Sequence, residues 1–99
     1  MAQYDVSRLS EGDVLVVDCQ SDLLDQIESR FVVPIVPLEQ FSTPARRLNP
    51  VFEIEGRRYV MLTQSASAVS RRELGPVVTS LADHDREIMN ALDLLLTGV

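Results

Sequence analysis

The sequence contains no lysine and no tryptophan, and it has a single cysteine and a single histidine. Without lysine, the chain has no side-chain amine for Schiff-base chemistry or amine nucleophiles. Without a second cysteine, Cys19 cannot form a disulfide within the chain or join a cysteine cluster that holds a metal. This cysteine content fits a protein of the reducing cytoplasm.

Long apolar segments are also missing. The chain has no run of about 18 apolar residues, the length that a membrane-spanning helix needs. Residues 1–5 have neither the basic start nor the apolar segment of a signal peptide. We therefore expect no membrane span, no signal peptide and a cytoplasmic location.

Positive charge is scarce, since 9 basic residues, all arginine, stand against 15 acidic ones and give a net charge of 9 − 15 = −6. Nucleic-acid-binding proteins usually present a basic face, so we expect no direct contact with DNA or RNA. A chain of 99 residues supports one hydrophobic core, and we expect a single domain over residues 1–99. Its function is expected at the surface or at a subunit interface, because so small a core leaves little room for an internal site.

Glycine and proline residues divide most of the chain into short segments rich in Val, Ile, Phe and Tyr, a spacing typical of strands. Strands are predicted at residues 3–7, 14–19, 30–36, 51–54 and 58–63, with a further candidate at 76–79. The clearest hairpin crosses residues 55–57, where Gly56 supplies a positive φ, and Phe52 and Ile54 share its buried face. Pro34 cannot donate to a sheet ladder and predicts an edge or a bulge in its strand.

The last fifth of the chain follows a helical period. From Leu81 onward, apolar residues recur at helical spacing at Ile88, Leu92, Leu95 and Val99. Ser80 and Asp83 resemble a capping box at the start of this helix, and Gly98 is expected to end it. The pattern predicts a mainly β domain with one C-terminal helix.

Residues that could carry out catalysis are few and lack partners. His84 stands among acidic residues at the predicted helix start, which favours a solvated surface position over a catalytic one. Cys19 lies in a predicted strand, which favours a small buried apolar role over a reactive thiol. We therefore predict that the chain is not an enzyme and needs no cofactor.

Charged clusters in the sequence also have ordinary explanations. Asp18, Asp22 and Asp25 lack the mid-loop glycine and terminal glutamate of a calcium-binding EF-hand loop, so turn and cap roles are favoured and no metal site is predicted. The arginine pairs at 46–47, 57–58 and 71–72 are interpreted as solvated or ion-paired rather than as a phosphate-binding face.

Two apolar segments are harder to explain. Leu23 and Leu24 lie between acidic residues in an expected loop, and residues 94–99 contain more leucine than one buried helical face requires. Exposed apolar side chains at a loop and a terminus are typical of a partner-binding surface. These residues alone leave core packing and partner binding equally open.

Several separated segments carry a resemblance to a known family. Residues 17–25 read Val-Asp-Cys-Gln-Ser-Asp-Leu-Leu-Asp and are similar to that family's Val-Asp-Val-Gln-Ser-Asp-Ile-Ile-Asp. Further similar segments are Arg-Phe-Val-Val-Pro-Ile at 30–35, Leu-Asn-Pro-Val at 48–51, Glu-Ile-Met-Asn-Ala-Leu at 87–92 and the final Gly-Val. From about Gln3 to Val99, the chain resembles the CcdB family of bacterial toxin–antitoxin systems.

The resemblance implies an SH3-like barrel of antiparallel strands with a C-terminal α-helix. It also implies a cytoplasmic homodimer that binds the A subunit of DNA gyrase and traps gyrase on cleaved DNA. Gyrase would supply the chemistry, and a cognate CcdA-like antitoxin would neutralise the toxin. The residues that the resemblance assigns to gyrase binding are Gln3, Tyr4, Ser21, Leu23, Leu24, Asp93, Leu96, Thr97, Gly98 and Val99.

The tip of the chain departs from the family pattern. The family's best-known member ends in Phe-Trp-Gly-Ile, whereas this chain ends in Leu96-Thr97-Gly98-Val99. Two alternatives to a gyrase poison stay open, because a related toxin family shares this barrel fold and because Thr97 is compatible with an inactive tip as well as a retuned one. One is an endoribonuclease of the same barrel fold that uses Arg46, Arg47 and His84, and the other is a degenerate relative that binds antitoxin only.

Overall fold

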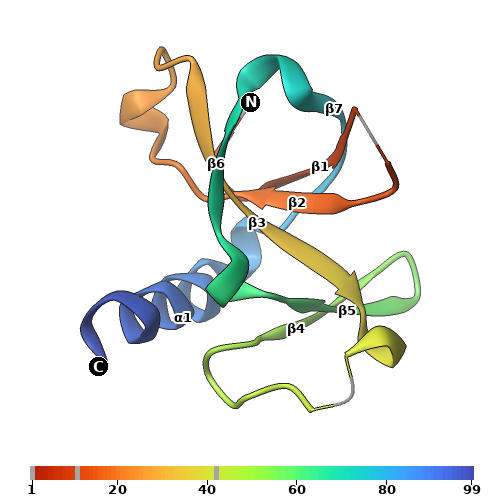
Figure 1. Ribbon diagram of the computed structural model, residues 1–99. Helices are drawn as coiled ribbons and strands as arrows, with labels where there is room; N and C mark the ends of the chain where they lie inside the picture. The colour runs from red at the N-terminus through yellow and green to blue at the C-terminus, as the bar shows by residue number, and fades with distance from the viewer. Residues whose placement is uncertain (1, 11, 42) are drawn as a thin grey trace.

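The computed structural model describes residues 2–10, 12–41 and 43–99. In these ranges the chain forms seven strands, one α-helix and five short 3-10 turns (Figure 1). The strands are β1 (Asp5–Leu9), β2 (Leu15–Asp18), β3 (Ser29–Pro37), β4 (Val51–Ile54), β5 (Arg57–Met61), β6 (Ser67–Ser70) and β7 (Leu74–Ser80). The helix is α1 (Asp85–Thr97), and the 3-10 turns are η1 (Asp22–Leu24), η2 (Leu38–Gln40), η3 (Thr63–Ser65), η4 (Arg71–Glu73) and η5 (Ala82–His84).

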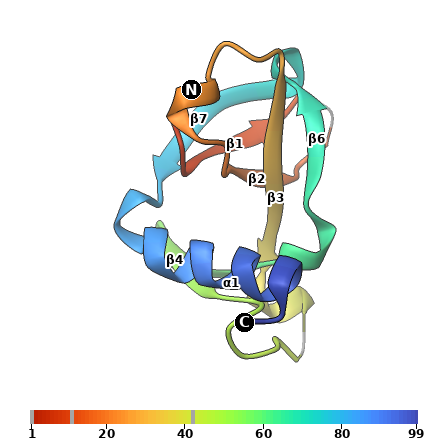
Figure 2. The ribbon, with the colours of Figure 1, turned by 90° about the vertical axis from the view of Figure 1, so that its left-hand side faces the viewer.

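The strands form one antiparallel sheet in the order β4-β5-β3-β2-β1-β7, with β6 paired to β3 outside this path. The sheet curls strongly, and α1 lies across its lower part in Figure 2. This arrangement confirms the predicted mainly β barrel with a C-terminal helix. Since β4 and β7 are the two ends of the strand order, the described part of the barrel is open between them.

The long strand β3 joins the two halves of the barrel. One edge pairs with β2, while the other pairs first with β6 and then, from Ile35 onward, with β5. The prediction that Pro34 marks an edge or bulge was wrong, because β3 is an interior strand. The Pro34 carbonyl accepts from the Leu62 amide. In an antiparallel strand, the amide and the carbonyl of one residue point to the same edge. The donor that Pro34 lacks therefore falls where the partner changes from β6 to β5.

The β4–β5 hairpin follows the predicted alternation. Phe52 and Ile54 are buried, while Val51 and Glu53 are exposed. Glu55 and Gly56 both have positive φ, at 53° and 79°, as a two-residue type I′ turn requires. The hairpin is confirmed with a turn one residue shorter than predicted.

The hydrophobic core lies between the curled sheet and the first half of α1. The helix buries Ile88, Ala91 and Leu92 against it. The predicted apolar stripe does not stay buried, however, since Leu95 is 41% exposed and Val99 is 78% exposed. In Figure 1 the C-terminal end of α1 extends beyond the sheet, so these side chains have no strand to cover.

The two ends of the helix compare differently with prediction. The predicted start at Ser80 was wrong: the Ser80 hydroxyl accepts from the Ala82 amide, residues 82–84 form the separate turn η5, and α1 begins only at Asp85. The predicted end is confirmed, since Gly98 has φ 77° and its amide donates to the Leu94 carbonyl.

Strand β4 has the predicted bounds and the ends of β2, β3, β5 and β7 shift by one or two residues, while β1 and β6 differ for structural reasons. The first strand begins at Asp5 rather than residue 3, because Tyr4 adopts a left-handed φ of 73° that interrupts extended backbone. Strand β6 was not predicted; its sequence, Ser-Ala-Val-Ser, has little apolar content, and pairing with β3 holds it in place.

Truncating the buried ring of the hairpin tests this account of the core. We expect Phe52→Ala to lower the free energy of unfolding by about 3–5 kcal/mol, because it leaves a cavity beneath α1 and removes the ring contact with His84. Urea denaturation measures this change. Val51→Ala, on the exposed face of the same strand, is the matched control and should cost about 1 kcal/mol or less; equal losses would contradict the assigned register.

Candidate functional site

The η1 turn presents Leu23 and Leu24 to solvent. Ser21 caps it, since its hydroxyl accepts from the Leu23 amide at 3.2 Å. Leu23 is 93% exposed and Leu24 is 50% exposed, and the turn contains no buried residue. These leucines are therefore surface residues, and core packing does not explain them.

The end of α1 is a second exposed apolar surface. Leu96 is 73% exposed and Val99 is 78% exposed, beside the half-exposed Leu95. Polar contacts fix this end: the Thr97 hydroxyl donates to the Asp93 carbonyl at 2.7 Å, and Arg47 donates to the Val99 carbonyl at 2.8 Å. The helix thus holds an ordered tip with apolar side chains on its outside.

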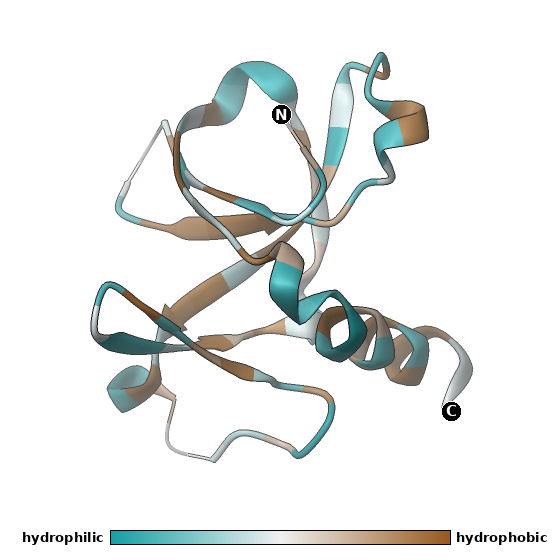
Figure 3. Cartoon of the chain, turned by 180° about the vertical axis from the view of Figure 1, so that it is seen from behind, coloured by the Kyte–Doolittle hydropathy of each residue, from teal (hydrophilic) through white to brown (hydrophobic). Residues whose placement is uncertain are grey.

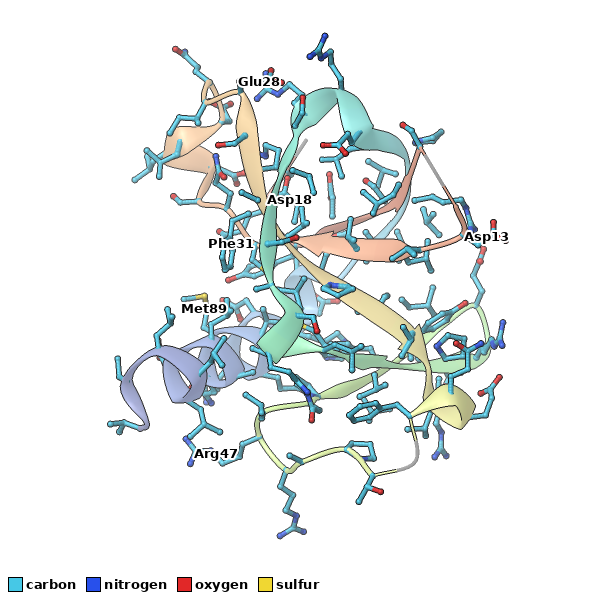
Figure 4. All side chains as sticks on the ribbon, in the orientation of Figure 1. Asp13, Asp18, Glu28, Phe31, Arg47 and Met89 are labelled. Atoms are coloured by element: carbon cyan, nitrogen blue, oxygen red, sulfur yellow. The ribbon has the colours of Figure 1, made fainter. Side chains whose placement is uncertain are left out.

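Both apolar surfaces face the same side of the molecule. In Figure 1, η1 and the end of α1 lie at the upper and lower left, and in the reverse view of Figure 3 both lie on the right. Figure 4 shows Phe31 and Met89 on this side as well, between η1 and the helix end. Met89 is 39% exposed and Phe31 is half-buried. The two leucine-rich surfaces thus share one side of the chain.

The remaining residues that the resemblance assigned to gyrase binding differ in exposure. Asp93 is exposed on α1, and Gln3 and Ser21 are half-buried beside η1. Tyr4 is only 8% exposed and belongs to the core. Burial raises the pKa of its phenol, and nearby Asp85 raises it further. The structure therefore brings Gln3 and Ser21 together with the leucines of η1 but places the Tyr4 ring mostly beneath the surface.

A buried ion pair lies directly behind η1. Asp18 and Arg30 are 1% and 0% exposed, and Nε and Nη2 of the arginine lie 2.9 and 2.8 Å from Oδ2 of the aspartate. The predicted turn role of Asp18 is confirmed in part, because its Oδ1 accepts from the Gln20 amide at 3.0 Å. Its pairing with Arg30 was missed. The available signal was an arginine at the start of an otherwise apolar strand, since a buried charge needs a partner.

The two residues weighed as catalytic candidates, Cys19 and His84, have structural roles. Burial raises the pKa of the Cys19 thiol to about 12, and Asp18 adds to the shift. The His84 ring packs against Phe52 with centroids 4.9 Å apart, and its Nδ1 lies 3.0 Å from Glu87. The predicted buried Cys19 is confirmed. The predicted solvated histidine was only partly right, because one side of the ring covers the core.

The arginine pairs lie on separate segments: the loop before β4, the β4–β5 hairpin and η4 (Figure 1). Arg57 pairs with Glu39 at 2.7 Å, Arg71 donates to the Asp25 carbonyl, and Arg47 holds the chain end. They do not form one basic face. Within the described ranges, no three His, Cys, Asp or Glu side chains are grouped closely enough to hold a metal ion.

No helix in the part of the chain that the structure describes is long and apolar enough to cross a membrane.

Together, the open barrel and its exposed leucines define a small protein whose prominent surface features are suited to binding another macromolecule. A sequence profile described as CcdB protein matches residues 3–98. The chain belongs to the CcdB family, the toxins of toxin–antitoxin systems.

The buried thiol yields a test of the site's chemistry. With a pKa near 12, Cys19 stays protonated at pH 8, so we expect the folded protein to react with iodoacetamide at least about tenfold more slowly than the urea-unfolded chain. The folded-state pKa of this thiol lies above the unfolded one. Its contribution to the free energy of unfolding is therefore fully present below about pH 8.5 and is lost as the pH rises toward 12. Labelling at the unfolded rate would contradict a buried thiol.

Proposed function

We propose that this chain acts as a homodimer in the cytoplasm, binds the A subunit of DNA gyrase and traps the gyrase–DNA cleavage complex. A cognate CcdA-like antitoxin neutralises it. The observation that carries the proposal is the exposure of Leu23, Leu24, Leu96 and Val99 on one side of a chain of this family. Burial of each such side chain against a partner contributes about 1.5–3 kcal/mol before ordering costs.

The proposal requires no catalytic residue in this chain. Gyrase cuts and rejoins the DNA, and the toxin only has to stabilise the cleaved state by binding it better than the resealed state. A net charge of −6 is compatible with this role, because gyrase rather than the toxin holds the DNA. The chain therefore acts on DNA through a protein partner.

The binding residues of the proposal come from η1 and the helix tip. Leu23, Leu24 and Leu96 supply apolar contact, and Asp93 and Ser21 supply polar groups at its margin. Gln3, Thr97, Gly98 and Val99 complete the surface, while Tyr4 supports it from the core. In a homodimer each copy contributes one helix tip, so a single gyrase A dimer meets two.

Thr97 lowers the apolar content of the tip. Its hydroxyl is engaged with the Asp93 carbonyl, and its side chain is exposed. A large aromatic at this position contacts only a partner, and truncation of such a residue commonly costs about 2 kcal/mol of binding energy. We therefore propose that this chain binds gyrase more weakly than relatives with an aromatic tip, or prefers a different gyrase.

Adding charge to the tip tests the proposal. We expect Leu96→Asp to weaken binding to the purified gyrase A subunit by about 30-fold or more and to abolish growth inhibition. The reason is that a carboxylate replaces the apolar contact that Leu96 makes with gyrase in the proposed complex. Deletion of residues 97–99 should have the same result. Binding is measured by surface plasmon resonance, and stabilised DNA cleavage by gel assay.

The matched control is Val14→Asp, which adds the same charge to an exposed aliphatic residue at the β1–β2 end, away from both leucine surfaces. It should bind gyrase normally. Toxicity that survives the tip variants would exclude the helix end from the mechanism. RNA cleavage lost on changing Arg46, Arg47 or His84 would instead favour an endoribonuclease, and antitoxin binding without gyrase binding would favour the degenerate relative.

Restoring an aromatic tests the role of Thr97. We expect Thr97→Trp to tighten gyrase binding by about tenfold or more, since the new ring lies on the exposed face and has no core contact to disturb. Thr97→Val, which loses the hydroxyl without adding a ring, is the control. Equal affinities for the tryptophan and valine variants would show that position 97 does not contact gyrase.

A further inference from the structure

The η1 turn has an unusual source of order. It contains no buried residue, and Leu23 is 93% exposed and Leu24 50%, so packing alone does little to hold the turn in place. Polar contacts from the residues around it must do so. We propose that Gln20 is a positioning residue, which fixes the η1 turn to strand β3 and thereby sets the pose in which Leu23 and Leu24 meet their partner.

Gln20 bonds in two directions through one side chain. Its Oε1 accepts from the Phe31 amide at 2.9 Å, and its Nε2 donates to the Leu24 carbonyl at 2.9 Å. The first bond attaches it to β3, and the second attaches it to the last residue of η1. A half-buried amide thus bridges the sheet and the exposed turn.

The bridge is itself anchored on the buried ion pair. The backbone amide of Gln20 donates to Oδ1 of Asp18 at 3.0 Å, while Oδ2 of the same carboxylate accepts from Nε of Arg30. Arg30 also donates to the Asp25 carbonyl at 3.4 Å, just beyond the turn. Both ends of η1 therefore connect to a pair of charges that burial makes costly to move.

Gln3 makes a second set of contacts at the start of the turn. The backbone amide of Gln3 donates to Oδ1 of Asp22 at 2.8 Å, and its side-chain Nε2 donates to the Cys19 carbonyl at 3.1 Å. Gln20 therefore bonds to the η1 backbone at Leu24, while Gln3 bonds to the Asp22 side chain and to the Cys19 carbonyl before the turn. Such preorganisation lowers the ordering cost that a loop otherwise pays on binding.

The inference rests on the proposed function for its partner, but its structural part is testable in the free protein. In Gln20→Ala the Phe31 amide loses its acceptor, so we expect its hydrogen exchange to rise at least about tenfold, while Val17 and Val33 in the core stay protected. Gln20→Glu, which keeps an acceptor for Phe31 but no donor for Leu24, should restore protection at Phe31 alone. Gln26→Ala, an exposed glutamine in the same loop, is the matched control and should change neither.

A double-mutant cycle separates positioning from direct contact or general loss of structure. With the gyrase A subunit as probe, we expect Gln20→Ala to weaken binding about tenfold in the natural sequence and in a Leu96→Ala background. In a background that carries Leu23→Ala and Leu24→Ala it should change affinity less than about twofold, because no leucines remain to be positioned.

The outcomes are distinct. A tenfold loss in the leucine-free background would overturn the inference, and so would unchanged exchange at Phe31 or unchanged affinity in the natural sequence. If the unsubstituted protein does not bind gyrase at all, the proposed function fails. The exchange measurements then still decide whether Gln20 holds the turn.

Discussion

The buried ion pair between Asp18 and Arg30 connects the interior of the barrel to the exposed η1 turn. It joins the end of β2 to the start of β3, and neither side chain has contact with solvent. Removing one partner of such a pair typically costs about 3–5 kcal/mol, because the other charge stays buried without compensation. The same two side chains also bond to the backbone on both sides of η1: Asp18 accepts from the Gln20 amide, and Arg30 donates to the Asp25 carbonyl. The stability of the barrel and the shape of the η1 turn therefore depend on the same ion pair.

Strand β3 distributes this constraint through the molecule. It pairs with β2 on one edge and successively with β6 and β5 on the other. The barrel halves consequently cannot separate without breaking β3 pairings. The helix closes the lower half through Ile88, Ala91 and Leu92 and then continues beyond the sheet. A rigid barrel of this kind positions two exposed surfaces without covering either.

Features with a local cause could be predicted from the sequence. The β4–β5 hairpin depends on alternation around Gly56, and the helix end depends on Gly98. Features made by long-range pairing could not be predicted. Strand β6 is held by its pairing with β3, which lies far from it in the sequence. For the proposed binding surface, the surplus leucines could be seen in the sequence. Only the structure shows that α1 extends beyond the sheet from about Leu95, so that the helix tip is left uncovered.

The extension of α1 beyond the sheet divides the helix into a part that serves folding and a part that does not. Substitutions at Ile88 or Ala91 act on folding, whereas the exposed side chains of Leu96 and Val99 cover no part of the core. The tip can therefore diverge between relatives at almost no cost to the barrel. If the tip contacts gyrase as proposed, a few terminal residues can change with the target while the part that must fold stays the same.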